Sequence, residues 1–252
     1  MVVHLAGLAH RQAGDIGPGE HASANCREPV RIARLAAAHG VARFVFASTA
    51  TMMPPSLHGA WRESDPPRPH DPYTRAKLDA ERLLLEMADP GRFDVVVLRP
   101  PLVWGPGVRA NFLRLLDMAA SPWPLPLGGA TAPRSMIFLD NVVDALLHAA
   151  CSPTVPTGMY FVADEVDRSV ADWIRAIRRL RGRPAGLLPV PAGLMRAAAR
   201  ATGREGMWER LFQPLRLDAS AFRATGWRPP LSFDEALRVT LDWHAARRAP
   251  GA

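Results

Sequence analysis

The amino-acid sequence predicts an α/β protein in which a doubly wound parallel sheet is joined to a smaller, mainly helical lobe. Short runs rich in Val, Ile and Phe alternate with helical patterns over the first 165 residues. Continuous apolar runs of this kind suit strands that helices cover on both faces, as in parallel sheets. Beyond this part the pattern becomes mainly helical and is broken by Gly and Pro, which favours a separate lobe.

Each expected element has its own place on the chain. The apolar runs expected to form strands lie at 1–7, 42–48, 93–100, 135–139 and 158–164. Helical periodicity between them indicates helices near 20–39, 71–88, 110–120 and 140–151. The later helices are expected at 168–181, 191–203, 206–214 and 232–247. The β-α-β order of the first part is typical of a doubly wound sheet.

The helix expected at 71–88 has a well-marked start. Asp71 is a favourable N-cap residue, and Pro72 suits the first helical position, where its missing N–H costs nothing. Tyr73 and Lys77 are four residues apart and therefore share one face of this helix. Its buried stripe is expected to contain Ala76, Ala80, Leu83, Leu84 and Met87.

The composition argues against several classes of protein. With 252 residues, of which 48% are hydrophobic, the chain can bury a substantial core. No apolar run reaches the roughly 18–20 residues that span a bilayer. Two cysteines, Cys26 and Cys151, give no disulfide framework and no metal-ligand cluster. The start of the chain has no signal-peptide pattern. We therefore expect a cytoplasmic protein that binds neither membrane nor metal.

A net charge of +7 has two interpretations. A basic chain can bind nucleic acid, but here the arginines are scattered and no aromatic residues interleave with them. An anionic small-molecule substrate fits the same charge. We therefore expect no nucleic-acid partner.

The spacing of two rare residues indicates proton-transfer chemistry. The chain has one lysine, Lys77, and it stands four residues after Tyr73, one of two tyrosines. A phenol is a poor base near neutral pH because its ordinary pKa is about 10. An ammonium group one helical turn away is expected to lower that pKa, so that the tyrosine can exchange a proton with a substrate hydroxyl or carbonyl. The alternative is an exposed pair that shares a helix face by coincidence.

Two hydroxyl residues end the strand expected at 42–48. Ser48 and Thr49 lie 24 or more residues before Tyr73. Taken alone, such a pair is more often a helix cap or a turn. Open α/β sheets, however, bind ligands at the carboxyl ends of their strands. Together with the Tyr/Lys pair, a hydroxyl group at this position is interpreted as a hydrogen-bond partner of the reacting substrate oxygen.

With these residues the chain resembles an extended short-chain dehydrogenase/reductase, of the NAD-dependent epimerase/dehydratase family that acts on nucleotide sugars. The resemblance covers nearly the whole chain and implies a Rossmann-like sheet. It is carried by the segments "VVHLAG", "FVFASTAT", "PYTRAK", "LRPPLVWGPG", "NFL", "RSMIFLDNVVDA" and "TGWRPPLSFDEAL". It implies a partial NAD(P)-binding domain at 1–165 and a substrate-binding lobe at 166–252, with contributions from 108–130.

The resemblance also implies roles for individual residues. The catalytic residues would be Thr49, Tyr73 and Lys77. The residues near a bound NAD or NADP would be Tyr73 and Lys77 together with Leu5, Ala6, Gly7, Asn25, Ser48 and Pro100. The residues that contact a nucleotide sugar, with a UDP-sugar favoured, would be Thr49, Asn111 and Arg134. A homodimer built through a helical bundle that includes 71–88 is expected as well.

The sequence departs from the family pattern in two places. The family begins with a strand and a turn of the form G-x-x-G-x-x-G, whose following helix holds the cofactor pyrophosphate. No such turn occurs here, and the glycines of 14–21 are expected to form a loop. About 60 residues, two βα units, would be needed to supply the absent part. The chain is then either a fragment of a longer enzyme or a shortened protein that has lost cofactor binding. The segment 51–56 also differs from the usual turn beside the sugar.

These observations favour a nucleotide-sugar 4-epimerase or a 4-ketosugar reductase. Sugar 4,6-dehydratases of this family carry an Asp-Glu pair after the catalytic Thr, whereas Ala50 and Thr51 follow Thr49 here. A hydroxysteroid-type dehydrogenase would share the Tyr/Lys pair. The alternative from another class is a non-catalytic remnant that binds a nucleotide or a protein partner.

Overall fold

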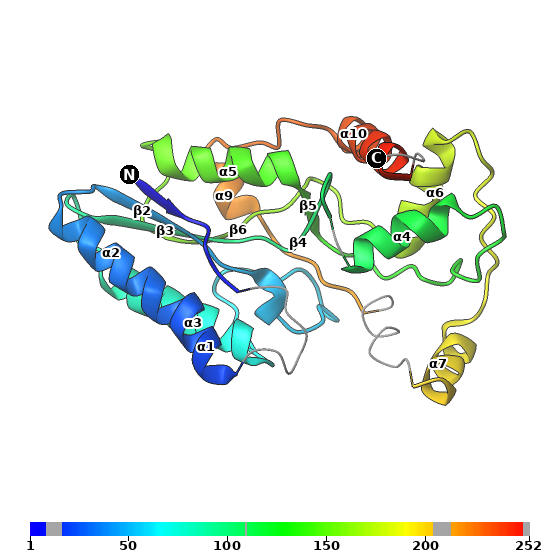
Figure 1. Ribbon diagram of the computed structural model, residues 1–252, viewed down its shortest axis with the longest axis horizontal. Coiled ribbons are helices and arrows are strands. Elements are labelled where there is room, and N and C mark those ends of the chain that lie inside the picture. Colours follow the sequence, from blue (N-terminus) through cyan, green and yellow to red (C-terminus); the bar gives the residue numbers. More distant parts are fainter. Residues whose placement is uncertain (9–16, 109, 204–212, 249–252) are drawn as a thin grey trace.

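The core of the protein is a parallel sheet of four strands in the order β1-β2-β3-β6 (Figure 1). The computed structural model describes the chain except for residues 9–16, 109, 204–212 and 249–252. The strands are β1 (Val2–His4), β2 (Arg43–Ala47), β3 (Asp94–Arg99) and β6 (Gly158–Phe161). All three pairings are parallel, so the loops that leave the strands gather along one edge of the sheet.

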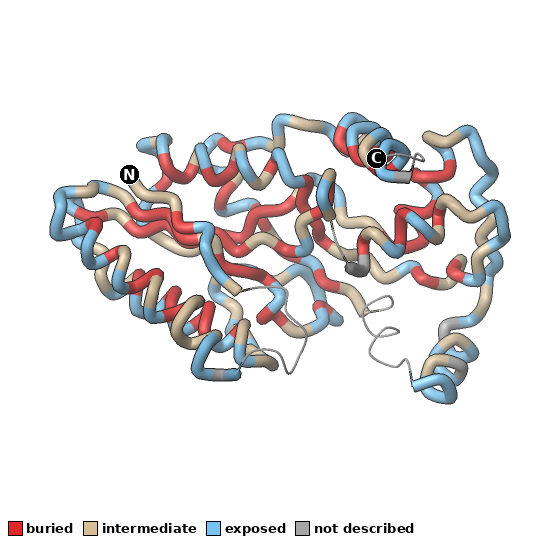
Figure 2. The backbone as a smooth tube through the Cα atoms, viewed as in Figure 1, coloured by how far each residue is buried: buried red, intermediate tan, exposed pale blue. Residues whose placement is uncertain are grey.

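The central pair of strands has a fixed register. Arg43 of β2 stands opposite Asp94 of β3, and the pairing continues without a bulge to Ala47 opposite Leu98. Because side chains alternate between faces, this register sends two sets of apolar residues to opposite sides. One face carries Phe44, Phe46, Val95 and Val97, and the other carries Val45, Val96 and Leu98. Figure 2 shows these strands as the most continuously buried part of the molecule.

Helices cover both faces of the sheet, as the sequence predicts. One layer contains α2 (Glu28–Ala38) and α3 (Pro72–Glu86), whose small residues Ala33, Ala76 and Ala80 pack on the aromatic face. The other layer contains α5 (Leu139–Cys151), which packs through Ala145 and Ala149. In Figure 1 the two layers lie below and above the sheet. The protein is therefore a doubly wound α/β structure, in agreement with the prediction.

A second group of elements packs around an aromatic cluster beyond the sheet. Its members are β4 (Leu102–Trp104), α4 (Ala110–Ala120), β5 (Met136–Phe138), α6 (Val170–Leu180) and α10 (Phe233–Arg248). The Trp104 ring lies 4.7 Å from that of Trp173 and 4.9 Å from that of Phe138. Edge-to-face aromatic contacts at this separation add stability beyond the area they bury. The helices α7 (Ala192–Ala201) and α9 (Ser220–Ala224) complete the described elements.

Several expected elements differ in detail. The strand expected at 135–139 forms β5 but pairs with β4 in a separate two-stranded ribbon, outside the main sheet. Neither β4 nor α9 is anticipated by the sequence pattern. The helix expected at 20–39 is observed as α1 (Pro18–Ala22), a π-helical turn η1 (Ser23–Arg27) and α2. Most of the helix expected at 206–214 lies outside the described residues.

Three residues of the expected α3 stripe are buried, namely Ala76, Ala80 and Leu84. Met87 is only partly buried against the same cluster, and 40% of Leu83 is exposed. Leu83 comes three residues after Ala80 and directly before Leu84. It therefore lies at the margin of the buried helix face rather than at its centre. The apolar face that contacts the sheet is therefore narrower than the sequence pattern suggests.

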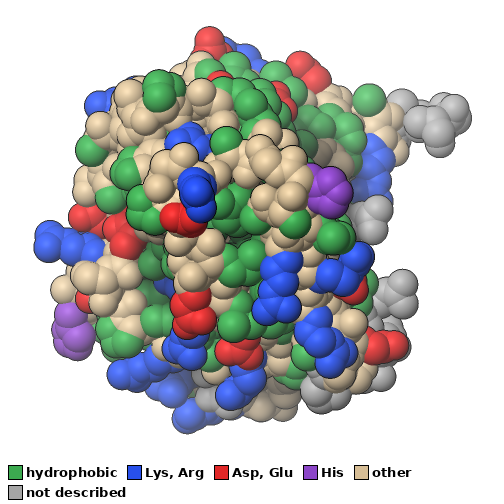
Figure 3. Space-filling view, turned by 90° about the vertical axis from the view of Figure 1, so that its left-hand side faces the viewer, with side chains coloured by type: hydrophobic (Ala, Val, Ile, Leu, Met, Phe, Trp, Pro, Cys, Tyr) green, Lys and Arg blue, Asp and Glu red, His purple; other side chains and the backbone are tan. Residues whose placement is uncertain are grey.

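Charged side chains are mixed by sign on the end of the molecule that carries the N-terminus. Figure 3 shows Lys and Arg side chains there interspersed with Asp and Glu and separated by apolar groups. On this face the charge does not form a single basic block of the type that tracks a phosphate backbone. Within the described part of the chain, no helix combines the length and apolar character needed to cross a membrane.

We expect the cap of α3 to be a local source of stability. The Asp71 side chain accepts a hydrogen bond of 2.7 Å from the Thr74 backbone N–H, and Thr74 returns the contact in a capping box. Asp71→Ala should lower the free energy of unfolding by about 1 kcal/mol. Urea denaturation followed by circular dichroism measures this change. Asp79→Ala, at an exposed position of the same helix, is the control and should leave stability unchanged; equal effects would contradict the capping role.

Candidate active site at the carboxyl ends of the strands

The loops after β2 and the start of α3 bring the predicted catalytic residues together. Thr49 caps the 3-10 turn η2 (Ala50–Met52) that follows β2, and Tyr73 lies in the first turn of α3. The Thr49 hydroxyl acts on the phenol and lowers the pKa of Tyr73. It also lies 2.9 Å from the Thr51 hydroxyl. Two hydroxyl groups at the start of the loop are therefore close to the phenol.

Lys77 is buried and bound to the end of β2. Its Nζ donates a hydrogen bond of 2.8 Å to the Ala47 carbonyl and lies 4.4 Å from the centroid of the Phe46 ring. Only 4% of the residue is exposed. Burial lowers the pKa of Lys77 from 10.5 to about 8, against an opposing influence of the Glu81 charge. The lysine predicted from the Tyr-x-x-x-Lys spacing is thus held in the site.

The pKa of Tyr73 shifts opposite to the lowering expected from Lys77. Burial raises this pKa above its ordinary value, and the influence of the Thr49 hydroxyl only partly offsets the rise. The reason is geometric, because the Lys77 ammonium is directed at the Ala47 carbonyl and the Phe46 ring. The ammonium group therefore interacts with the end of β2 and not with the phenol.

The loop after β1 closes over Asn25 and Lys77. A Cβ atom placed on Gly7 would come within 2.7 Å of Asn25 Oδ1 and 3.5 Å of Lys77 Nζ. Asn25 is fully buried and binds Leu8 twice, accepting from its N–H at 2.9 Å and donating to its carbonyl at 3.2 Å. The structure therefore brings the predicted residues Gly7 and Asn25 to Lys77. Leu5 and Ala6, in the same segment, are exposed.

Ser48 turns away from the position expected for it. Its hydroxyl donates to the buried Glu81 carboxylate, so only its main chain remains for a cofactor. Glu81 also forms a buried ion pair with Arg99, whose Nε lies 2.9 and 3.1 Å from the two carboxylate oxygens. Sequence reasoning missed Glu81 and Arg99. The signal was present, because Glu81 follows Lys77 by four residues on the same helix.

A histidine that sequence reasoning left without a role also borders the site. The His21 ring packs edge-on against Tyr73 at a centroid distance of 6.3 Å. Its Nδ1 lies 3.2 Å from the Asn25 side-chain nitrogen. Because that nitrogen is a donor, Nδ1 accepts and the ring proton lies on Nε2. Nothing in the sequence spacing indicates this contact.

The predicted substrate residues lie farther along the chain. Arg134 donates from Nη1 to the Gln213 carbonyl at 2.5 Å, and its main chain pairs with Leu215. Leu215 packs against η2, the turn after Thr49, so Arg134 is linked to the site through this segment. Pro100 accepts a hydrogen bond of 2.8 Å from Ala50. The Asn111 side chain lies outside the described part of the structure.

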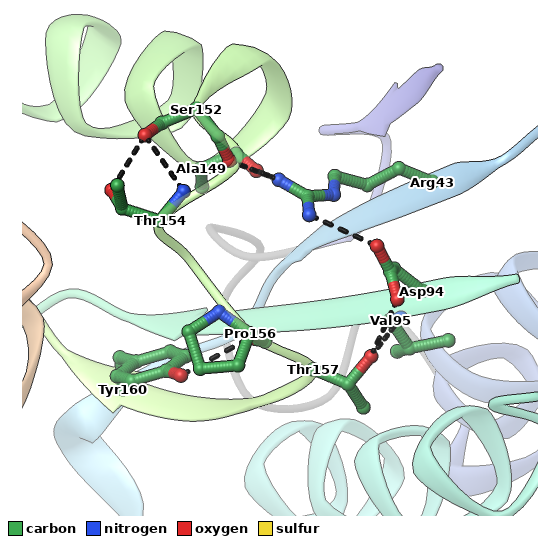
Figure 4. Close-up of polar contacts among 9 residues, drawn as sticks. All are labelled: Arg43, Asp94, Val95, Ala149, Ser152, Thr154, Pro156, Thr157 and Tyr160. Carbon is green, nitrogen blue, oxygen red and sulfur yellow. Dashed lines mark hydrogen bonds and ion pairs between the residues drawn. The ribbon is translucent and has the colours of Figure 1, made fainter. Parts of the chain in front are cut away.

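The second tyrosine has a different environment. Tyr160 Oη donates to the Pro156 carbonyl at 3.0 Å. Figure 4 shows it in the region where Arg43 joins Asp94, with 2.9 Å between nitrogen and oxygen. Tyr160 itself stands opposite Leu98, but its hydroxyl reaches back to Pro156, ahead of β6. The hydroxyl therefore lies toward the amino end of the sheet, where Arg43 and Asp94 begin β2 and β3. Of the two tyrosines, only Tyr73 contacts the hydroxyl group after β2.

Comparison with known proteins identifies the relatives of this arrangement. The sequence model of the NAD dependent epimerase/dehydratase family matches residues 1–162. The chain belongs to this family. It is 31% identical over 248 residues to the UDP-glucose 4-epimerase of Vibrio cholerae, an alignment that covers 95% of this chain and 75% of that protein.

Solved structures show the same fold. MoeE5 in complex with UDP-glucose and NAD has a TM-score of 0.72 and 24% identity, with coverage of 98% of this chain and 79% of that one. The UDP-glucuronic acid 4-epimerase of Bacillus cereus in complex with NAD has a TM-score of 0.74 and 19% identity, with coverage of 98% and 75%. These similarities agree with the Rossmann-like fold expected from the sequence.

The close approach of Gly7 generates a stability prediction. Gly7→Ala should destabilise the protein by about 1–3 kcal/mol, because the new methyl group collides with an Asn25 oxygen that its own hydrogen bonds hold in place. Chemical denaturation measures the loss. Gly19→Ala is the control, since a Cβ there meets nothing within 4 Å. If both variants unfold at the same denaturant concentration, the tight approach is refuted.

The depressed pKa of Lys77 generates a pH prediction. Between pH 8 and 10.5 the unfolded lysine binds more protons than the folded one, so its contribution to stability rises with pH in this window. Below pH 8 the buried Lys77 is charged, and burial of this charge lowers the stability of the folded state by its full amount, on the order of 3 kcal/mol. The stability of the wild type relative to Lys77→Met should therefore rise between pH 8 and 10.5. Urea denaturation across this range measures the difference, and a flat difference would contradict the burial of the charge.

Proposed function

We propose that the chain is the catalytic and substrate-binding part of an NAD(P)-dependent nucleotide-sugar epimerase or 4-ketosugar reductase. The observation that carries the proposal is the placement of the Thr49 hydroxyl, which acts on the Tyr73 phenol, beside a buried Lys77 bound to the Ala47 carbonyl. This group lies at the carboxyl ends of the strands, where open α/β sheets bind their ligands. The 31% identity to a UDP-glucose 4-epimerase supports the same reaction class.

Each residue of the group has a role that follows from its contacts. Tyr73 exchanges a proton with the sugar oxygen, as acid in one direction and base in the other. Thr49, whose hydroxyl acts on the phenol, shares that proton and positions the same oxygen. Lys77, held by the Ala47 carbonyl, keeps further N–H donors for the hydroxyl groups of a ribose. A bound nicotinamide cofactor supplies hydride transfer at the sugar carbon.

The residues present fit one half of such a cofactor. The absence of a Cβ at Gly7 lets the main chain of 5–7 lie directly against Asn25 and Lys77, and a glycine tolerates such a close approach. These residues would hold the nicotinamide and its ribose. The glycine-rich turn that would hold the pyrophosphate does not occur in the sequence. The fit therefore concerns the nicotinamide side alone.

The substrate side supports a nucleotide sugar. Arg134 is partly buried and basic, and burial lowers its pKa, so its guanidinium gains from an anionic partner such as a diphosphate. Ala50 and Thr51 after Thr49 do not supply the carboxyl pair that dehydration requires, which favours epimerisation or reduction. A homodimer through α3 and a cytoplasmic location remain predictions.

A specific observation favours a second candidate, a binding protein without catalytic activity. Among the described strands, β1 pairs only with β2, which leaves its other edge open to a further strand or a protein partner. In this case the chain would hold a nucleotide or a partner through an incomplete sheet.

The two tyrosines provide a matched test of the proposal. The purified chain is supplied with NAD and UDP-glucose, and formation of the 4-epimer is followed together with NAD binding. Tyr73→Phe should lower kcat by about 100-fold or more, because only the exchanging hydroxyl is lost. Tyr160→Phe, which removes a hydroxyl at the amino end of the sheet, should remain active.

Two results would contradict the proposal. Activity near the wild-type level in Tyr73→Phe would remove the phenol from the mechanism. A wild-type chain that neither binds NAD nor converts a UDP-sugar would favour the non-catalytic candidate.

A further inference from the structure

Glu81 lies close to the proposed catalytic residues. It contacts neither Tyr73 nor the residues of the loop after β1 that are predicted to bind the cofactor. It lies one helical turn after Lys77 on α3 and is only 2% exposed. Its carboxylate accepts hydrogen bonds from the Ser48 hydroxyl, just after β2, and from Arg99, the last residue of β3. One side chain therefore ties α3 to the ends of both central strands.

The neighbours of these partners are the residues that do the proposed chemistry. Ser48 immediately precedes Thr49, and Arg99 immediately precedes Pro100. The backbone N–H of Ala50 binds the Pro100 carbonyl at 2.8 Å, so the two strand ends are also joined directly. A shift of α3 against β2 would change the separation of Tyr73 and Thr49. The buried ion pair resists such a shift, because its geometry is restricted by charge-assisted hydrogen bonds.

We propose that Glu81 is a positioning residue, which through Ser48 and Arg99 fixes the distance between the Tyr73 phenol and the Thr49 hydroxyl. It also keeps Lys77 in place against the Ala47 carbonyl and the Phe46 ring. The inference rests on the proposed function for its kinetic consequence, but its structural consequence is independent of cofactor and turnover. A buried ion pair is weak evidence for stability alone, whereas an interaction that orders a reacting pair acts on the rate.

The chain offers two direct readouts, because it has one lysine and two tyrosines. Isotope-labelled lysine gives a single NMR signal whose titration reports Lys77. The titratable groups that interact with it are Glu81 on the same helix, whose charge raises the pKa of Lys77, and His4 on β1, whose own pKa is lowered by burial and by Lys77. Fluorotyrosine, whose phenol titrates at a lower pH, gives two fluorine signals, and Tyr160→Phe identifies the one from Tyr73.

The test compares Glu81→Gln with Glu86→Gln, which removes the same charge from an exposed position of α3. Glu81→Gln should lower the pKa of Lys77, because a neighbouring negative charge is lost. It should raise the pKa of Tyr73, because the Thr49 hydroxyl, which lowers this pKa, would no longer be held beside the phenol. In the active enzyme, kcat should fall about 100-fold with KM changed less than about threefold. Glu86→Gln should change none of these quantities.

A second variant keeps the test informative if the buried Arg99 charge, left unpaired, prevents Glu81→Gln from folding. Glu81→Gln/Arg99→Gln removes both charges and should fold, yet still show the raised pKa of Tyr73. The proposal is overturned if the folded variants leave the Tyr73 titration where Glu86→Gln leaves it. Two results together would separate the proposals: the wild-type chain does not bind NAD, yet Glu81→Gln still raises the pKa of Tyr73. In that case the proposed function fails while the positioning role stands.

Discussion

The parallel register of β2 and β3 is the constraint on which the rest of the structure depends. Its five consecutive pairs place Ala47 opposite Leu98, and the ladder continues past the strands through Ser48 N–H to the Leu98 carbonyl. A slip of one residue would turn Phe44 and Phe46 to the other face and move Thr49 away from α3. The same register that separates the two helix layers therefore also aligns the strand ends that build the site.

The site concentrates buried charge that the fold has to stabilise locally. Lys77, Glu81 and Arg99 are each less than 5% exposed, although charged groups are seldom buried unless they are paired. Glu81 is paired with Arg99 and Ser48, whereas Lys77 is bound to a neutral carbonyl and stacked on an aromatic ring. Arg99 Nη1 has no hydrogen-bond partner among the described residues. Such an arrangement is costly for a purely structural core and is typical of a functional site.

The sequence predicts the parts of this site that depend on local rules and fails where packing decides. The Asp71–Pro72 start of α3 follows from capping preferences, and the spacing of Tyr73 and Lys77 follows from helix geometry. The orientation of the Ser48 hydroxyl could not be predicted, because its partner lies 33 residues away on another element. The pKa of Tyr73 was assigned the wrong direction because burial, which no spacing reveals, outweighs its neighbours. The pairing of β5 with β4 outside the main sheet likewise depends on tertiary contacts.

The directions of the two pKa shifts together define the protonation state from which the proposed chemistry begins. With Lys77 near 8 and Tyr73 above its ordinary value, both groups hold their protons at neutral pH. In the proposed function the phenol would therefore start as an acid and donate to a carbonyl oxygen that receives hydride. To act as a base it would first have to lose its proton, and among the described residues the Thr49 hydroxyl, which also contacts Thr51, acts to lower its pKa. The Lys77 ammonium is directed at the Ala47 carbonyl instead, so in this proposal Thr49 acts more directly on the phenol than the ammonium group that the sequence spacing indicates.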